Sequence, residues 1–210
     1  MPPQSPRRRK GRRKTAKAKV SVPRQMCAHR NYHTSTKQAA IADLAVVAFY
    51  YLLRVGEYTH PRYVSRNGKA HRVTRTVQFA VQSVGFFKHS KLIPRTAPLS
   101  ALLQADQATL KITNQKNGRM GQTIHHHANN QIDCPVHALA RRVHHILSHH
   151  GTEEHLICDY CESGTWHSVT STDIRQGIRT AVIELGLDKK GIDPDLVGVH
   201  SLRAGGAMAL

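Results

Sequence analysis

Aromatic residues, acidic residues and long apolar runs are all scarce in this chain. Phe, Trp and Tyr make up 5% of its 210 residues, and 13 Asp and Glu stand against 31 Lys and Arg. No run approaches the roughly 18 apolar residues that a membrane span needs, and no basic-then-apolar signal peptide opens the sequence. We therefore expect a cytosolic or nuclear protein with no membrane partner.

Cysteine is also scarce, with four residues in the chain: Cys27, Cys134, Cys158 and Cys161. This number in a chain of this length does not indicate a disulfide framework, so we expect reduced thiols. Cys158 and Cys161 have metal-ligand spacing, and several histidines lie nearby in the sequence. A zinc site needs a second spaced pair of ligands, and the chain has a single C-x-x-C. We therefore predict no metal and no other cofactor.

Positive charge is what the chain has in excess. The net charge is +18, and residues 1–19 hold nine Lys or Arg and no acid, which leaves +9 for residues 20–210. A basic body with a basic tail favours a polyanion as partner, because each phosphate contact releases condensed counterions. A membrane surface is the weaker alternative, since no amphipathic basic helix accompanies the charge.

The composition divides the chain into a tail, residues 1–36, and one domain, residues 37–210. Residues 1–24 are rich in Pro, Arg and Lys and cannot bury apolar surface, so we predict disorder there. Such a tail suits a nuclear localisation signal, a DNA-tracking arm or both, with a solvated leader of no specific role as the alternative. We expect a nuclear location.

Apolar spacing and turn residues predict an α+β domain dominated by helix, with a small antiparallel sheet. Helices are predicted at residues 36–56, 135–151, 171–186 and 200–210, and a strand pair within residues 73–88. Residues 108–113 and 122–126 should form a hairpin around Asn117-Gly118. The sixteen histidines would add positive charge on exposed faces as the pH falls below about 6.5, although ordinary surface composition also explains them.

Three short motifs could carry chemistry. Arg54 and Glu57 lie three residues apart in Leu52-Leu-Arg-Val-Gly-Glu-Tyr58, Lys116 lies on the connection of the predicted hairpin, and His200 and Arg203 form an H-x-x-R pair. Each motif alone is typical of solvated surface residues. The order of the three along the chain is what distinguishes them.

In this order, the motifs resemble the catalytic domain of the tyrosine recombinase (phage integrase) family. The surrounding sequence is similar to the crypton type found in eukaryotic mobile elements. Four stretches carry this similarity: residues 39–58, Asn114-Gln-Lys-Asn-Gly118, Cys134-Pro-Val-His-Ala-Leu-Ala-Arg-Arg142 and His200-Ser-Leu-Arg-Ala-Gly-Gly206. The resemblance covers residues 37–210. It implies a recombinase-like fold, double-stranded DNA and further recombinase subunits as partners, and an ancestral role in DNA recombination and DNA integration.

The chemistry of DNA cleavage fits these residue types. Attack on phosphorus places negative charge on the non-bridging oxygens, and two guanidinium groups, Arg54 and Arg203, can hold it bidentately. The family resemblance implies that Lys116 is the general acid for the departing 5′ oxygen. His200 would carry a proton or donate a hydrogen bond to phosphate. Glu57 would orient the two arginines or the neighbouring backbone, and this chemistry requires no metal.

Two departures from the family pattern leave it uncertain whether the chain is an enzyme. In the family, the nucleophilic Tyr and a preceding His or Trp lie downstream of H-x-x-R, whereas seven residues follow Arg203 here and all six tyrosines precede His200. Without that Tyr no covalent phosphotyrosyl intermediate forms. Residues 1–36 are also too short and polar for the family's core-binding domain. The alternatives are a non-catalytic DNA-binding remnant of a mobile element and a truncated chain that folds poorly.

Overall fold

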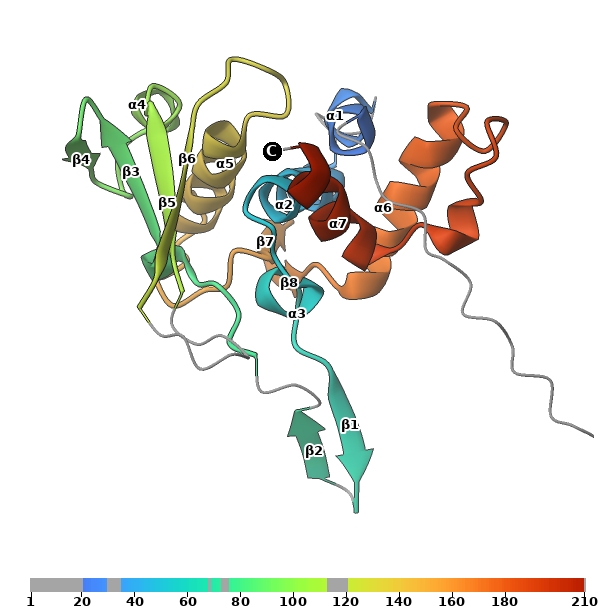
Figure 1. The fold of residues 1–210 in the computed structure, drawn as a ribbon. Helices are drawn as coiled ribbons and strands as arrows, with labels where there is room; N and C mark the ends of the chain where they lie inside the picture. Colours follow the sequence, from blue (N-terminus) through green and yellow to red (C-terminus); the bar gives the residue numbers. More distant parts are fainter. Residues whose placement is uncertain (1–20, 30–34, 68, 73–75, 113–120, 210) are drawn as a thin grey trace, which may run out of the picture.

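The computed structural model describes residues 21–29, 35–67, 69–72, 76–112 and 121–209. The fold is α+β, with helices gathered around one helix and a small antiparallel sheet at their side (Figure 1). The longer helices are α1 (Ser21–Ala28), α2 (Thr36–Tyr50), α5 (Pro135–Ser148), α6 (Ser171–Glu184) and α7 (Val199–Ala209). Short helical turns are α3 (Val55–Tyr58), η2 (Val81–Ser83), α4 (Leu99–Leu102) and η3 (Pro194–Leu196).

Helix α2 lies at the centre of the molecule. Its N-cap is Ser35, whose hydroxyl accepts a hydrogen bond from the backbone N–H of Gln38 at 3.3 Å, as the start signature in the sequence predicted. Every residue from Ala40 to Phe49 is buried, because α1, α5, α6 and α7 all pack against this helix. Asp43 is buried within it and forms an ion pair of 2.6 Å with Arg141 of α5.

The main sheet has the strand order β4-β3-β5-β6 and is antiparallel throughout. Its strands are β3 (Val84–Lys88), β4 (Lys91–Ile93), β5 (Gln107–Lys111) and β6 (Thr123–His127). The predicted hairpin of residues 108–113 and 122–126 is confirmed by the pairing of β5 with β6. Helix α5 contacts β3, β5 and β6, and the residues that alternate toward it, such as Phe86 and Leu110, are fully buried.

The strand pair predicted within residues 73–88 is wrong. Residues 81–83 form the turn η2, and the single strand β3 follows it, while residues 73–75 lie outside the described residues. Two hairpins were not predicted: β1 (Tyr63–Arg66) with β2 (Lys69–Arg72), and β7 (Asp159–Glu162) with β8 (Thr165–Ser168). Each strand in these hairpins has four residues, which is too short for an alternation pattern to stand out.

The predicted tail also needs correction, because its last part includes a helix. Residues Ser21–Ala28 form α1, and Val22 and Cys27 are 1% and 0% exposed in the core. The apolar residues of this one short helix were outweighed by the basic composition around them. The helices predicted near residues 135–151 and 171–186 are confirmed as α5 and α6. Among the described residues, no helix is long and apolar enough to cross a membrane.

Candidate functional site

A cavity of about 250 Å³ lies where the end of α2, the turn α3, the base of the β5–β6 hairpin and helix α7 meet. It brings together two of the candidate residues, Arg54 and Arg203, which are far apart in the sequence. The residues that line it are Tyr50, Tyr51, Leu52, Leu53, Arg54, Glu57, Ile112, Ile124, His126 and Arg203.

A break in the backbone after α2 positions Arg54. The predicted helix of residues 36–56 ends at Tyr50 instead, because Leu52 adopts a positive φ of 55° and Arg54 is extended with φ −80° and ψ 145°. Arg54 is therefore the N-cap of the short turn α3, rather than a residue near the C-terminal end of a long helix. Its side chain is 30% exposed and lines the cavity.

Glu57 contacts Arg54 in two ways. One carboxylate oxygen accepts the Arg54 backbone N–H at 2.6 Å, and the other accepts the guanidinium Nη1 at 3.3 Å. The Glu57 side chain is 9% exposed. A buried carboxylate with two such donors fixes both the backbone and the side chain of Arg54. The geometry is that of a residue that positions Arg54.

Arg203 reaches the cavity from helix α7, which packs across α2. His200, one turn earlier on the same helix, is exposed and is not among the residues that line the cavity. The H-x-x-R pair therefore lies on one helix, but the structure brings only its arginine into the cavity.

Lys116 lies outside the described residues. The described ends of its connection are Ile112 and Gly121, and they are paired: the Gly121 N–H donates to the Ile112 carbonyl at 2.9 Å. Ile112 itself lines the cavity. The connection that carries Lys116 in the sequence thus leaves and rejoins the described structure beside the cavity with the two arginines.

His126 is a cavity residue that the sequence analysis missed, because it was grouped with His125 and His127 as surface composition. Its ring lies edge-on to Tyr51, with centroids 4.7 Å apart. Burial lowers the pKa of His126, since the charged imidazolium loses solvation, and the ring is therefore neutral at pH 7. The alternation of β6, in which exposed and half-buried residues alternate, is the signal that could have identified His126.

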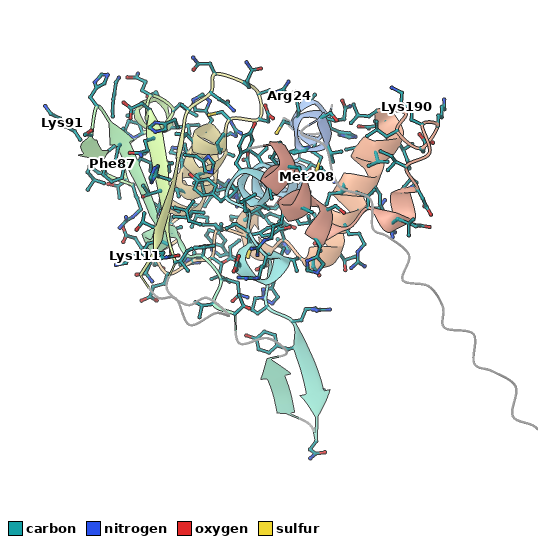
Figure 2. The ribbon with its side chains drawn as sticks, in the orientation of Figure 1. Arg24, Phe87, Lys91, Lys111, Lys190 and Met208 are labelled. Atoms are coloured by element: carbon teal, nitrogen blue, oxygen red, sulfur yellow. The ribbon has the colours of Figure 1, made fainter. Side chains whose placement is uncertain are left out.

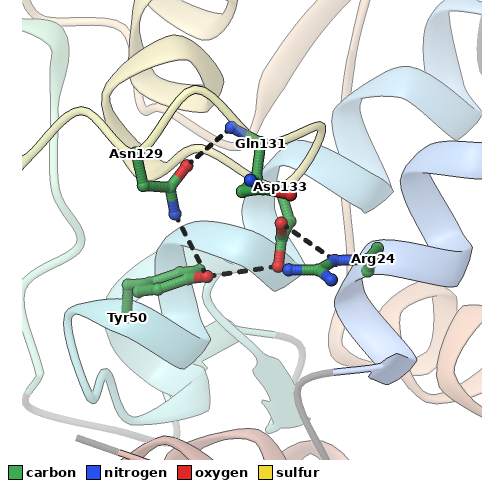
Figure 3. Close-up of polar contacts among 5 residues, drawn as sticks. All are labelled: Arg24, Tyr50, Asn129, Gln131 and Asp133. Atoms are coloured by element: carbon green, nitrogen blue, oxygen red, sulfur yellow. Dashed lines mark hydrogen bonds and ion pairs between the residues drawn. The ribbon is translucent and has the colours of Figure 1, made fainter.

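Tyr50 lines the cavity and also belongs to a polar network with Asp133, Asn129 and Arg24 (Figure 3). Its hydroxyl donates to Asp133 at 3.2 Å and accepts from the Asn129 amide at 3.3 Å, while Arg24 of α1 donates to the other Asp133 oxygen at 3.2 Å. Asp133 is fully buried. Burial and the Asp133 charge raise the pKa of Tyr50 to about 12, so this phenol stays protonated.

Two of the other tyrosines are also hydrogen-bonded or buried. The Tyr51 hydroxyl donates to the Ala108 carbonyl at 2.8 Å, and burial raises its pKa strongly. Tyr58 is fully buried beside Glu57, and its pKa is raised by that burial. Of the tyrosines in the described part of the chain, Tyr50 and Tyr51 line the cavity, and neither has a hydroxyl that is free to attack phosphorus.

Arg141, Arg142 and the C-x-x-C pair have structural roles here. Arg141 holds the buried Asp43, and Arg142 is 2% exposed and donates to the backbone carbonyls of Ile157 and Asp159. Cys158 and Cys161 are both buried near and on β7. Within the described ranges, no group of three or more His, Cys, Asp or Glu side chains is placed to hold a metal ion.

No family model, curated protein or solved structure matches this chain.

Proposed function

We propose that this chain is a DNA-binding protein of tyrosine-recombinase type that holds a DNA backbone phosphate between Arg54 and Arg203. The observation that supports the proposal most is that both arginines line one cavity, although one follows α2 and the other lies on the last helix. Their order and local sequence first suggested the resemblance. In the fold, the two residues line the same cavity.

The electrostatics of the cavity favour an anion. Its lining has two guanidinium groups and a single carboxylate, and that carboxylate, on Glu57, is occupied by Arg54. Burial lowers the pKa of His126, which disfavours its charged form. A guanidinium presents several N–H donors in a plane, so two of them can bind the non-bridging oxygens of one phosphate bidentately. In this proposal Lys116 approaches the same phosphate from the β5–β6 connection and His200 from the first turn of α7.

The ancestral reaction in this proposal is strand cleavage and rejoining, as in DNA recombination and DNA integration in the nucleus. A second candidate function, DNA binding without cleavage, is favoured by the tyrosines of the cavity. Both Tyr50 and Tyr51 use their hydroxyls in protein hydrogen bonds and have raised pKa values. A hydroxyl nucleophile is activated by a neighbouring general base or by a lowered pKa, and the pKa of both phenols is raised instead.

A binding experiment tests the phosphate site. Duplex DNA of about 20 base pairs, labelled with fluorescein, is titrated with the protein at several salt concentrations. The double variant Arg54→Ala/Arg203→Ala should bind at least about tenfold more weakly, because charge-assisted hydrogen bonds to phosphate are lost. The slope of log Kd against log salt should also fall by about one to two, one for each phosphate contact removed.

The matched control is Arg175→Ala/Lys190→Ala, which removes the same charge at two exposed residues of α6 and the loop after it. If both double variants lose the same affinity, the binding follows net charge alone and the cavity is not a phosphate site. A deletion of residues 1–19 measures the contribution of the basic tail, and it must stop before α1 because Val22 belongs to the core.

A suicide duplex, nicked so that a cleaved end diffuses away, separates the two functions. In the binding-only function, no covalent protein–DNA adduct accumulates on a denaturing gel. An adduct that disappears in Tyr50→Phe or Tyr51→Phe would show cleavage by this chain and would overturn the binding-only function.

A further inference from the structure

The main sheet has an open face that the cavity does not use. Helix α5 contacts β3, β5 and β6 from one side, and the antiparallel register places nine residues on the other side. All nine are half-buried or exposed: Gly85, Phe87, Leu92, Gln107, Thr109, Lys111, Thr123, His125 and His127. Figure 2 labels Phe87 and Lys111 at this open side of the sheet.

Three flat rings lie on this face. His125 and His127 belong to the outer strand β6, with ring centroids 6.3 Å apart and planes at 78°. Phe87 pairs in register with Gln107, which pairs with His127, so the phenyl ring and an imidazole belong to one cross-strand row. The rings thus lie on two strands, β3 and β6, with β5 between them.

Gly85 leaves room for the Phe87 ring on this face. A Cβ at this position would lie 2.7 Å from the Thr109 hydroxyl and 3.2 Å from the Phe87 ring. The Phe87 ring therefore leans along the strand over Gly85, where a larger residue would push it away. The Thr109 hydroxyl also donates to the Gly85 carbonyl at 3.4 Å. The Phe87 ring and the Thr109 side chain thus fill the space above Gly85, and the phenyl ring lies over the middle of the face.

The charge of the face is positive. None of its nine residues is acidic, and Lys111 is exposed on it. Asp106 directly precedes Gln107 in the sequence, and its carboxylate accepts the backbone N–H of His89 at 2.7 Å. Lys88 and Lys91 alternate to the other side of the sheet, so the charge of this face comes from Lys111. An anionic ligand is therefore favoured over a neutral or basic one.

We propose that this open sheet face binds single-stranded nucleic acid, with bases stacked on Phe87, His125 and His127 and a phosphate beside Lys111. Unpaired bases expose flat surfaces that stack on aromatic and imidazole rings, and basic side chains follow the backbone. In a duplex those surfaces are covered by neighbouring bases. The duplex major groove admits a helix or a two-stranded ribbon, and this sheet is four strands wide.

The composition of the face separates this ligand from a protein partner. Phe87 and Leu92 are the two large apolar residues among the nine, whereas the centre of a protein interface is more apolar and poor in charge. The inference rests on the proposed function only in taking nucleic acid as the ligand, since the face and the arginine cavity share no residue.

The test uses the full chain and a fluorescein-labelled 12-nucleotide oligothymidine, with a blunt duplex of mixed sequence as the second probe. Phe87→Ala should weaken binding of the oligothymidine by roughly five- to 150-fold, the range that one lost stacking contact gives. Duplex affinity should change by less than about twofold. Phe87→Tyr should restore single-strand binding, because a phenol ring stacks as well as a phenyl ring.

A second variant keeps the proposal testable if Phe87→Ala folds poorly. His125→Ala/His127→Ala changes two exposed residues and should weaken oligothymidine binding by at least about fivefold. Its matched control is His149→Ala/His167→Ala, two exposed histidines of other elements, which should leave the affinity unchanged. Circular dichroism confirms that each variant is folded.

Three results would overturn the inference: no binding of the oligothymidine, an equal loss in the two histidine pairs, or an equal loss for duplex and single strand. The Arg54→Ala/Arg203→Ala variant distinguishes the two proposals. If it binds duplex normally but Phe87→Ala still loses the single strand, the cavity proposal fails and the sheet-face proposal stands. If instead Arg54→Ala/Arg203→Ala loses duplex binding and Phe87→Ala binds the single strand normally, the sheet-face proposal fails and the cavity proposal stands.

Discussion

Gly206 of α7 lies directly against the backbone carbonyl of Phe49 on α2. A Cβ at position 206 would clash with that oxygen and lie 2.8 Å from the Leu52 side chain. The two helices can approach this closely because residue 206 has no side chain. Arg203 lies one turn earlier on α7, so the same contact holds Arg203 beside the end of α2, where the chain turns toward Arg54.

We therefore predict that Gly206→Ala pushes α7 away from α2. The free energy of unfolding should fall by about 1–3 kcal/mol, as for other overpacked contacts, because a backbone carbonyl cannot rotate away. This exceeds the up to about 1 kcal/mol that Ala gains over Gly within a helix. Urea denaturation measures the change, and duplex binding should weaken as Arg203 moves.

Gly198→Ala is the control, because a Cβ there would meet no atom within 4 Å. It should leave both the stability and the affinity near their original values. An equal effect of the two substitutions would show that the helix approach at Gly206 has no special role.

The sequence was most informative where one face of a long element is buried. The stripe of Val136, Leu139, Val143, Ile146 and Leu147 predicted α5, and all of these residues except the half-buried Leu147 are fully buried in the structure. The β5–β6 hairpin was predicted by its turn chemistry and is confirmed by strand pairing. Local patterns of this kind depend only on residues that are close in the sequence, so they can be recognised without knowledge of the tertiary structure.

What the sequence could not show depends on contacts between distant residues. The positive φ of Leu52, which ends α2 early and makes Arg54 an N-cap, occurs at a residue type that rarely adopts it. The cavity position of His126 depends on β6 pairing and on the tyrosines of α2. The spacing of Arg54 and Glu57 did indicate their contact, whereas the cavity that joins Arg54 to Arg203 appears only in three dimensions.

Tyr50→Phe tests the network in Figure 3. The change removes one of the hydrogen bonds to the fully buried Asp133 carboxylate and leaves Arg24 as its partner. We expect a loss of about 1–3 kcal/mol in the free energy of unfolding, the range for a buried charged acceptor that loses a donor. Urea denaturation at pH 7 measures it. Tyr63→Phe, at a tyrosine that is 54% exposed, should change the stability by less than about 0.5 kcal/mol.

Asp173→Asn tests the start of α6 and its link to α2. The carboxylate accepts the Thr170 hydroxyl at 2.6 Å and pairs with Lys37 of α2 at 2.7 Å. Burial would raise the pKa of Asp173, but the hydrogen bonds from Lys37 and Thr170 outweigh it and lower the pKa. Replacing a capping side chain of this kind costs about 1 kcal/mol at pH 7.

The lowered pKa of Asp173 determines how the free energy of unfolding changes with pH. A carboxyl with a lowered pKa stabilises the fold above its unfolded pKa, and that stability is lost as the pH falls through its folded pKa. The difference between the original chain and Asp173→Asn should therefore shrink as the pH falls below about 4, the ordinary pKa of an aspartic acid. The exposed Asp188 supplies the control, and Asp188→Asn should show no such convergence.

His145 should make the free energy of unfolding depend on pH over a higher pH range than Asp173 does. Its ring nitrogen Nε2 accepts the backbone N–H of Cys161 at 3.0 Å, which requires the unprotonated ring. Burial, followed by the nearby Arg142 charge, lowers the pKa of His145 to about 4. The unfolded chain, with an ordinary histidine value of about 6.5, takes up a proton at a higher pH than the folded chain.

The unfolded state therefore binds more protons between about pH 6.5 and pH 4, and the free energy of unfolding must fall as the pH is lowered through this window. The limit for one group is about 1.4 kcal/mol per pH unit. A fraction of that is expected, because the half-buried ring is partly screened by solvent. His145→Gln keeps an acceptor for the Cys161 N–H but cannot bind a proton, so its stability should fall less steeply.

Urea denaturation at half-unit steps from pH 7 to pH 4 measures both slopes. The exposed His167 of β8 gives the matched variant His167→Gln, which should follow the original chain. His126, whose pKa burial also lowers, contributes to the same window, so His145→Gln should flatten the curve without abolishing its slope. Parallel curves for the original chain and His145→Gln would mean that His145 binds its proton over the same pH range in the folded and the unfolded chain, and the Cys161 hydrogen bond would then be wrong.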